Sequence, residues 1–273
     1  MSYHRPVWAP DSIDIEKPSA ARMYDYYLDG SHNFAADRQL AEEAKSAFPN
    51  MREYCLANRA FLHRAVTALS ELGIGQFLDL GSGIPTASNV HEVAQAVNPD
   101  ARTVYVDCDA VAYAHGVALL AGEPTACFVQ ADLRDPDDVL GDATVRGFLD
   151  FGRPIAVLLF SVLPFVPDAD DPRAIVAAYR DACAPGSYLA LTHGTADYHP
   201  AEAGELRRVY NRASHSMTPR PRSAVHDLMA GYELIEPGLT DAILWRPDPQ
   251  APPDPFGGDV SRYSLYAAVG KKN

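Results

Sequence analysis

Positive charge and long apolar runs are both scarce in this chain of 273 residues. Lysine and arginine together number 23 against 36 aspartates and glutamates, which gives a formal net charge of −13 at pH 7. Proteins bind nucleic acids by neutralising phosphates with cationic side chains, so this balance argues against a nucleic-acid partner and against an anionic membrane surface. No apolar run approaches the roughly 20 residues that a membrane-spanning helix needs.

Cysteine is also rare. The four cysteines are widely scattered, with no Cys-x-x-Cys pair: Cys55, Cys108, Cys127 and Cys183. This spacing predicts neither a disulfide framework nor a zinc site, and we expect no bound metal. The first residues lack the apolar core of a signal peptide. We therefore expect a cytoplasmic protein with reduced thiols, and the composition leaves a homodimer open.

A glycine turn near one quarter of the chain lacks the marks of two common ligand-binding loops. Residues 76–83, Gln-Phe-Leu-Asp-Leu-Gly-Ser-Gly, read as a buried strand that breaks into a turn before a helix. Backbone N–H groups can approach a ligand closely there. A dinucleotide fingerprint needs a third glycine where Thr86 stands, after Pro85, and a phosphate loop needs a lysine that is absent.

Strand-like and helical segments alternate from Gln76 onward. The strands predicted after the first are 102–107, 125–130, 155–160 and 186–192, with helices over 89–97, 110–121 and 172–183. The run 155–160, Ile-Ala-Val-Leu-Leu-Phe, is apolar throughout, as expected of a central strand covered on both faces. This alternation predicts an α/β protein with a doubly wound, mostly parallel sheet.

The two ends of the chain have other patterns. Before the first strand, apolar spacing and helix-stop glycines predict helices over 19–28, 37–48 and 50–72. After the fifth strand, a polar segment over 193–221 precedes a helix over 223–230 and strands over 232–235, 242–245 and 262–269. We divide the chain into a helical N-terminal extension, 1–73, and a core, 74–273, within one integrated domain.

Acidic residues follow the second and third predicted strands. Asp107 ends one strand, where its carboxylate can accept hydrogen bonds from both hydroxyls of a ribose, and Asp132 follows the next, where it can accept from an adenine amino group. Helix capping is the alternative interpretation of such acids. Their joint placement around one crevice favours a nucleoside ligand. Leu133 would pack on the adenine ring, and Ser161 and Val162 would meet the other end of the ligand.

Several motifs resemble one family of proteins. The longest, over 22–37, reads Arg-Met-Tyr-Asp-Tyr-Tyr-Leu-Asp-Gly-Ser-His-Asn-Phe-Ala-Ala-Asp, and shorter ones lie at 58–62, 76–79, 83–86, 89–95, 104–107 and 236–239. Together they span nearly the whole chain. Through these motifs, the chain resembles a family of S-adenosylmethionine-dependent methyltransferases that is common in actinobacteria and was long catalogued as a domain of unknown function (DUF574). The glycine turn, Asp-x-Gly-x-Gly, is similar to the first motif of such enzymes.

The resemblance implies a class I methyltransferase fold, which is Rossmann-like, with a seven-stranded, mostly parallel sheet, an antiparallel last strand and a helical N-terminal extension. It also implies S-adenosylmethionine as the methyl donor. A sulfonium cation is stabilised by aromatic faces and carbonyl oxygens, so Tyr24, Tyr27 and Asn33 could form a lid, or simply pack as an amphipathic face. Arg59 could bind the donor carboxylate or form an ordinary salt bridge. The predicted donor-binding set is Tyr24, Asn33, Arg59, Asp79, Gly81, Ser82, Gly83, Asp107, Cys108, Asp132, Leu133, Ser161 and Val162.

A general base is harder to find in the sequence. His193, at the end of the fifth predicted strand, is the candidate catalytic residue, with Tyr198 and His199 beyond it. A lone histidine there is as often structural. The Asn/Asp-Pro-Pro-Tyr motif of amino-group methyltransferases is absent after the fourth strand, which continues as Ser-Val-Leu-Pro-Phe over 161–165. This favours a small, partly apolar acceptor over a nucleic-acid base or an amide.

Three hypotheses follow. The first is a methyltransferase that acts on a small molecule. The second is a protein that binds S-adenosylmethionine or S-adenosylhomocysteine without catalysis, which the weak general-base signal leaves open. The third, an NAD-dependent oxidoreductase, shares Asp107 but fails at the glycine spacing.

Overall fold

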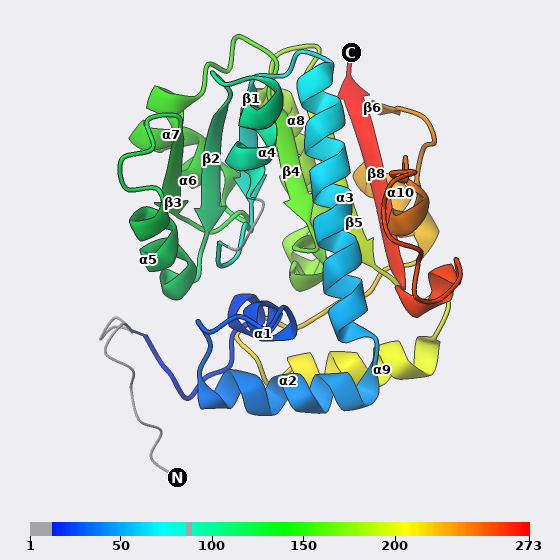
Figure 1. Ribbon diagram of the computed structural model, residues 1–273. Helices are drawn as coiled ribbons and strands as arrows, with labels where there is room; N and C mark the ends of the chain where they lie inside the picture. Colours follow the sequence, from blue (N-terminus) through cyan, green and yellow to red (C-terminus); the bar gives the residue numbers. More distant parts are fainter. Residues whose placement is uncertain (1–12, 86–88) are drawn as a thin grey trace.

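An eight-stranded sheet forms the centre of the molecule (Figure 1). The computed structural model describes residues 13–85 and 89–273. Strands pair in the order β3-β2-β1-β4-β5-β8-β6, and β7 pairs with β8. The pairs among the first five strands are parallel, whereas β8 is antiparallel to its neighbours β5, β6 and β7. The strands are β1 (Gln76–Leu80), β2 (Arg102–Asp107), β3 (Ala126–Gln130), β4 (Ala156–Phe160), β5 (Tyr188–Gly194), β6 (Tyr232–Leu234), β7 (Thr240–Asp241) and β8 (Leu265–Lys272).

Helices cover both faces of the sheet and create two hydrophobic cores. One face packs against α3 (Met51–Glu71), α4 (Val90–Val97) and α5 (Ala110–Leu119). The other packs against α6 (Pro136–Gly141), α7 (Ala143–Phe148), α8 (Pro172–Ala182) and α10 (Arg222–Leu228). Strands β1 and β4 are buried along their whole length, as their apolar sequences predict. The doubly wound α/β architecture predicted from the sequence is confirmed.

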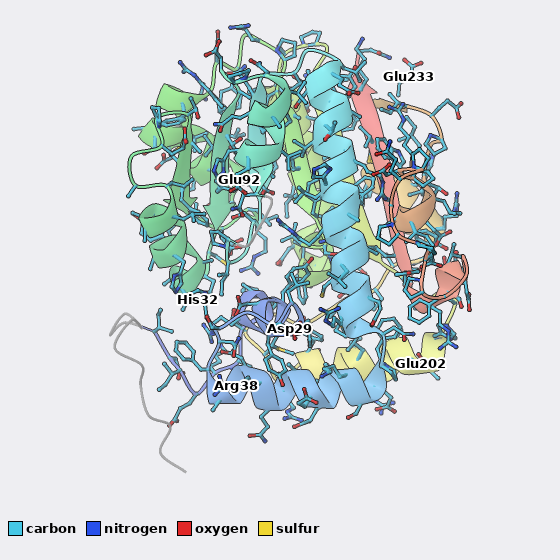
Figure 2. All side chains as sticks on the ribbon, in the orientation of Figure 1. Asp29, His32, Arg38, Glu92, Glu202 and Glu233 are labelled. Atoms are coloured by element: carbon cyan, nitrogen blue, oxygen red, sulfur yellow. The ribbon has the colours of Figure 1, made fainter. Side chains whose placement is uncertain are left out.

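Three further helices lie across the carboxyl ends of the parallel strands (Figure 1). They are α1 (Ala20–Tyr27), α2 (Ala35–Ala47) and α9 (Pro200–Tyr210), and α2 packs against both of the others. The loop after α1, which carries His32 (labelled in Figure 2), reaches α5, and the rings of His32 and His115 lie 3.7 Å apart between centroids. Ligands of doubly wound sheets bind at this edge. Helix α1 and the segment before it therefore form one wall of the candidate site.

Helix α9 occupies the middle of the segment 193–221, for which the sequence predicts polar character and no particular element. Its exposed residues are mostly charged, and only Leu206 and Tyr210 are buried. Two apolar positions four residues apart stabilise a helix only when another element covers them. Here α2 provides that cover, which a sequence pattern within α9 cannot reveal.

Two predictions near the C-terminus are wrong in detail. The predicted strand 242–245 is the 3₁₀-helix η3 (Ala242–Leu244), because the Arg64 guanidinium binds the carbonyls of Ala242 at 2.6 Å and Trp245 at 2.9 Å. The last strand begins at Leu265, not at Arg262, because Ser264 adopts φ +46° and ends the preceding 3₁₀-helix η4 (Val260–Arg262).

The sheet also has eight strands where the family resemblance implies seven, because the two-residue β7 pairs with β8 beside the main strand order. Two short 3₁₀-helices, η1 (Leu163–Phe165) and η2 (Asp168–Asp170), follow β4. None of the helices in the described part of the chain is long and apolar enough to cross a membrane.

Candidate active site

A cavity of about 360 Å³ opens at the carboxyl ends of β1, β2, β3 and β4. The loops after these four strands form its floor, and residues from the N-terminal segment, from α3 and from the segment after α9 form its walls. Of the predicted donor-binding set, these residues line the cavity: Tyr24, Arg59, Asp79, Gly81, Ser82, Gly83, Asp107, Cys108, Asp132, Leu133, Ser161 and Val162.

The glycine turn after β1 is held against β2 and β4. The amides of Gly81 and Ser82 donate to the carbonyl of Val106, at 2.8 and 3.1 Å. Gly81 and Gly83 both adopt positive φ, at +69° and +67°, which favours glycine. A Cβ at Gly81 would lie 2.2 Å from a methyl of Val162, whereas a Cβ at Gly83 would meet no atom within 4 Å. Thr86, in place of the third glycine, lies outside the described residues.

Asp107 joins the loops after β1 and β2. Its Oδ2 accepts the Gly83 amide at 2.7 Å, and its Oδ1 accepts the Asp109 amide at 2.8 Å. Burial raises its pKa to about 6, although these two backbone hydrogen bonds oppose the shift. Each carboxylate oxygen retains further lone pairs. A pair of ligand hydroxyls at the cavity edge could therefore bind to it.

Asp79 and Arg59 form the charged part of the cavity near β1. Asp79 is 5% exposed, and burial raises its pKa to about 7; the nearby Arg59 lowers it, and Asp107 raises it further. Arg59, on α3, is half-buried and lines the same cavity. This pairing of one cation with one acid suits a zwitterionic group, since an amine and a carboxylate would each find an opposite charge.

The chain after β4 turns sharply at Ser161, which adopts φ +56° and is buried. Its amide donates to Thr192 Oγ1 at 2.8 Å, and its hydroxyl pairs with that of Tyr54 at 2.7 Å. Thr192 Oγ1 donates in turn to Asn58 Oδ1 at 2.6 Å, and Asn58 Nδ2 donates to the Tyr24 hydroxyl at 2.9 Å. This chain of contacts fixes an otherwise strained turn beside the cavity.

Asp132 lies at the opposite end of the cavity, where Arg134 binds it. The two closest atoms, Asp132 Oδ2 and Arg134 Nη2, are 2.6 Å apart, and Arg134 also reaches Asp170 at 3.1 Å. Burial opposes ionisation of Asp132, but the hydrogen bonds from Arg134 outweigh it and lower the pKa. The neighbouring Leu133 is buried, with its carbonyl bound by the Tyr179 hydroxyl.

A buried ionic network attaches the N-terminal segment to the cavity. Arg22 is 4% exposed and binds Asp37 at 2.9 Å and Asp109 at 3.1 Å. Ser19 also donates to both acids, through its amide to Asp37 and its hydroxyl to Asp109. Asp109 caps α5 and stands two residues after Asp107. The wall that α1 forms is therefore fixed to the loop that carries Asp107.

Asn33 and His193, from the predicted donor-binding and catalytic sets, do not line the cavity, and neither do Tyr27, Tyr198 and His199. Asn33 donates to Asp25 at 2.8 Å and to the Gly30 carbonyl at 2.9 Å, so it closes the turn after α1. His193 is fully buried; its Nδ1 donates to the Gly194 carbonyl at 2.8 Å, and its Nε2 accepts from Arg220 at 3.1 Å. Burial lowers its pKa to about 3. This position gives His193 a structural role and does not support general-base catalysis.

Sequence reasoning missed several residues of the wall. Arg22 falls inside the longest motif but carried no assigned role, and the Asp-Cys-Asp pattern over 107–109 was the signal for a second functional acid. Ser214 and His215 follow α9 and line the cavity because the Ser214 amide binds the Pro18 carbonyl at 2.8 Å. No local pattern marks that long-range contact.

One polar atom indicates that the cavity fits a ligand. Ser82 Oγ is buried and has no protein hydrogen-bond partner in the described part of the chain. A buried hydroxyl without a partner is costly unless something else satisfies it. The open side of Gly83 and the charges of Asp79, Arg59 and Asp107 surround the same space. A ligand that combines a nucleoside with an amino-acid group matches this arrangement.

The sheet order and the residues that line the cavity are those expected of a class I S-adenosylmethionine-dependent methyltransferase. Comparison with known proteins agrees. A family model described as S-adenosyl methyltransferase matches residues 6–273, and the chain belongs to this family. S-adenosylmethionine is therefore its cofactor.

Two solved structures are similar over nearly their whole length. One, described as a candidate methyltransferase from Thermobifida fusca YX, is 42% identical with a TM-score of 0.91, and the match covers 98% of this chain and 100% of that chain. The other, a DUF574 family protein from Streptomyces avermitilis, is 37% identical with a TM-score of 0.90 and coverage of 95% and 99%. A search of curated proteins finds no match.

Proposed function

We propose that the 360 Å³ cavity binds S-adenosylmethionine and that the protein transfers its methyl group to a small molecule. The observation that carries this proposal is Asp107, a buried carboxylate held by the Gly83 amide at the edge of the cavity. The ribose hydroxyls would donate to it. Leu133 and Asp132 would contact the adenine, although Asp132 would have to accept from the adenine amino group while bound to Arg134.

The amino-acid end of the donor would lie between Arg59 and Asp79, with Ser82 Oγ as a further contact. When bound, S-adenosylmethionine supplies an electrophilic methyl group on a sulfonium centre. The residues of this chain would orient that centre and exclude water from it. Tyr24 and Ser161 stand where the cavity continues beyond the glycine turn, and a tyrosine ring or hydroxyl oxygen stabilises a cation there.

The walls of the cavity support the proposal of a small acceptor. Helices α1, α2 and α9 cross the carboxyl edge of the sheet, which would block a macromolecule from the donor (Figure 1). The net charge of −13 argues in the same direction against nucleic acid. A binding protein without catalysis is the competing function. Production of S-adenosylhomocysteine from S-adenosylmethionine over a panel of metabolite extracts would decide between them.

We expect Asp107→Ala to weaken the binding of S-adenosylhomocysteine by about 1–3 kcal/mol, because two ligand hydroxyls would lose their acceptor. Isothermal titration calorimetry measures this change. Asp100→Ala is the matched control, since Asp100 is exposed just before β2 begins, at the other end of that strand, and should leave the affinity unchanged. Equal affinities of wild type and Asp107→Ala, or binding of NAD in place of S-adenosylhomocysteine, would contradict the proposal.

We also expect donor affinity to depend on pH through Asp107. Its pKa of about 6 means that the carboxylate accepts hydrogen bonds above pH 6 and is protonated below it. Affinity should fall by up to about tenfold per pH unit below this value. Calorimetry between pH 8 and pH 5 tests this. Asp107→Asn should remove the loss of affinity below pH 6 and leave the change near pH 7 that comes from Asp79, whose pKa is about 7.

The raised pKa of Asp107 affects folding stability in the opposite direction to donor affinity. The folded protein holds this proton more tightly than the unfolded chain, so the contribution of Asp107 to stability rises as pH falls from about 6 towards about 4. A loss of donor affinity at low pH that persists in Asp107→Asn would assign the effect to another group.

A further inference from the structure

A second, smaller cavity of about 60 Å³ adjoins the first. It lies between α1, α3, α9 and the loops after β4 and β5. Four residues line both cavities and so form the boundary between them: Ala20, Tyr24, Ser161 and Phe165. Ser161 stands at the end of β4, next to the glycine turn. A group in the second cavity would therefore face the end of the donor site where the methyl group would lie.

The second cavity limits its occupant to one small ring. Its volume of about 60 Å³ is less than half that of a cavity of about 150 Å³ that holds benzene. A single ring therefore fills the second cavity and extends past the boundary residues into the larger one. The ligand of this cavity is therefore much smaller than the donor nucleoside.

Aromatic and apolar side chains dominate the lining of the second cavity. They include Phe48, Met51, Phe165, Leu206 and Met217. Neither lysine nor arginine belongs to its lining within the described residues. A charged ligand would lose its hydration there and find no opposite charge to replace it, apart from His199 and Glu202 at the start of α9. Figure 2 labels Glu202 on that helix.

Hydroxyl groups provide the polar contacts. The Tyr54 and Ser161 hydroxyls pair at 2.7 Å, and the Tyr27 and Tyr210 hydroxyls pair at 3.1 Å. Burial raises the pKa of Tyr27, Tyr54 and Tyr210, so all three phenols stay neutral at physiological pH. Neutral hydroxyl pairs can donate to and accept from a ligand hydroxyl, but they do not neutralise a charge.

We propose that this second cavity is the methyl-acceptor site and that it takes a neutral, single-ring molecule carrying a hydroxyl group. The inference rests on the proposed methyltransferase function. The ligand ring lies among Phe48, Met51 and Met217, and its hydroxyl lies against the Tyr54–Ser161 pair at the boundary with the donor cavity.

Methyl transfer to the acceptor hydroxyl releases one proton, and a residue of this lining can accept it. A lone pair of the acceptor oxygen attacks the methyl carbon; the C–O bond forms as the S–CH₃ bond breaks, and its electron pair returns to sulfur as S-adenosylhomocysteine forms. The hydroxyl proton passes to the imidazole of His199, which lines the cavity with its Nδ1 3.9 Å from Glu202. Imidazole is the side chain in this lining best able to accept a proton at neutral pH.

The test fills the second cavity and leaves the first unchanged. Ala203, on α9, lines the second cavity only, whereas Ala201 is exposed on the same helix and lines neither. Ala203→Phe and the milder Ala203→Leu are the test variants, and Ala201→Phe is the control. Calorimetry first measures S-adenosylhomocysteine binding and then titrates 4-methylphenol or benzoate into the saturated complex. Mass spectrometry detects 4-methoxytoluene after incubation with S-adenosylmethionine.

We expect 4-methylphenol to bind the wild type and the control and to be methylated by both, and benzoate not to bind. Each Ala203 variant should bind 4-methylphenol at least about tenfold more weakly, a difference of about 1.4 kcal/mol, with S-adenosylhomocysteine affinity within about twofold of wild type. Absence of S-adenosylhomocysteine binding to the wild type would instead contradict the proposed function. With that binding intact, three results would overturn the acceptor site: no phenol binding, unchanged phenol binding in both Ala203 variants, or binding without product.

Discussion

Replacing Arg22 by alanine should lower the free energy of unfolding by about 3–5 kcal/mol, the cost of leaving buried charges without their partner. Arg22 is 4% exposed and binds Asp37, which is fully buried, and Asp109. It also donates to the Lys17 carbonyl at 2.6 Å and lies over the Phe34 ring. Loss of the guanidinium would leave one carboxylate in the interior with only backbone donors. Chemical denaturation monitored by circular dichroism measures the change.

Arg52→Ala is the matched control for this prediction. Arg52 also pairs with an aspartate, Asp29, at 3.0 Å, but both side chains are at least half exposed. Exposed pairs of this kind contribute about 0–1 kcal/mol. The same stability loss in both variants would show that burial of the Arg22 network adds nothing. Donor affinity adds a second readout, since Arg22 also lines the donor cavity and holds Asp109, two residues beyond Asp107.

Periodic, strongly apolar segments were the predictable part of the fold. Strand β4 and helix α3 have patterns that admit one interpretation, and both lie within a residue or two of their predicted bounds. Helix α9 and the segment at Trp245 were not predictable, because contacts with α2 and with Arg64 decide their conformation. Such contacts join residues far apart in the sequence, so the helix and strand propensities of the local residues do not predict them.

In the donor site, too, the sequence predicted some residues correctly and could not predict others. The glycine turn and Asp107 were predictable because β-strand ends in a doubly wound sheet converge on one crevice. His193 has an equally suitable position in the sequence, yet the Arg220 guanidinium occupies its Nε2 and the chain encloses it. The sequence predicts where a strand ends, but not which way the side chain of its last residue points, because side chains alternate between the two faces along a strand. The direction of the side chain decides whether such a residue faces the cavity or the core.

Gly81→Ala should be the most damaging change in the glycine turn. The new Cβ would lie 2.2 Å from a methyl of Val162, and the residue would also have to keep φ at +69°. Left-handed backbone costs a residue with a Cβ about 1–2 kcal/mol, and overpacking costs about 1–3 kcal/mol more. The unfolding free energy should therefore fall by about 2–5 kcal/mol, as measured by chemical denaturation without ligand.

Gly83→Ala separates these two costs, because Gly83 has nearly the same φ, +67°, but an added Cβ would meet no atom within 4 Å. Its unfolding free energy should fall by only the backbone cost, about 1–2 kcal/mol. Because Gly83 lines the donor cavity and donates to Asp107, the same methyl group should weaken S-adenosylhomocysteine binding in a protein that remains folded. Equal stability losses in the two variants would mean that Val162 moves aside at no cost. Close packing between the turn after β1 and the chain after β4 would then not be what makes a glycine necessary at position 81.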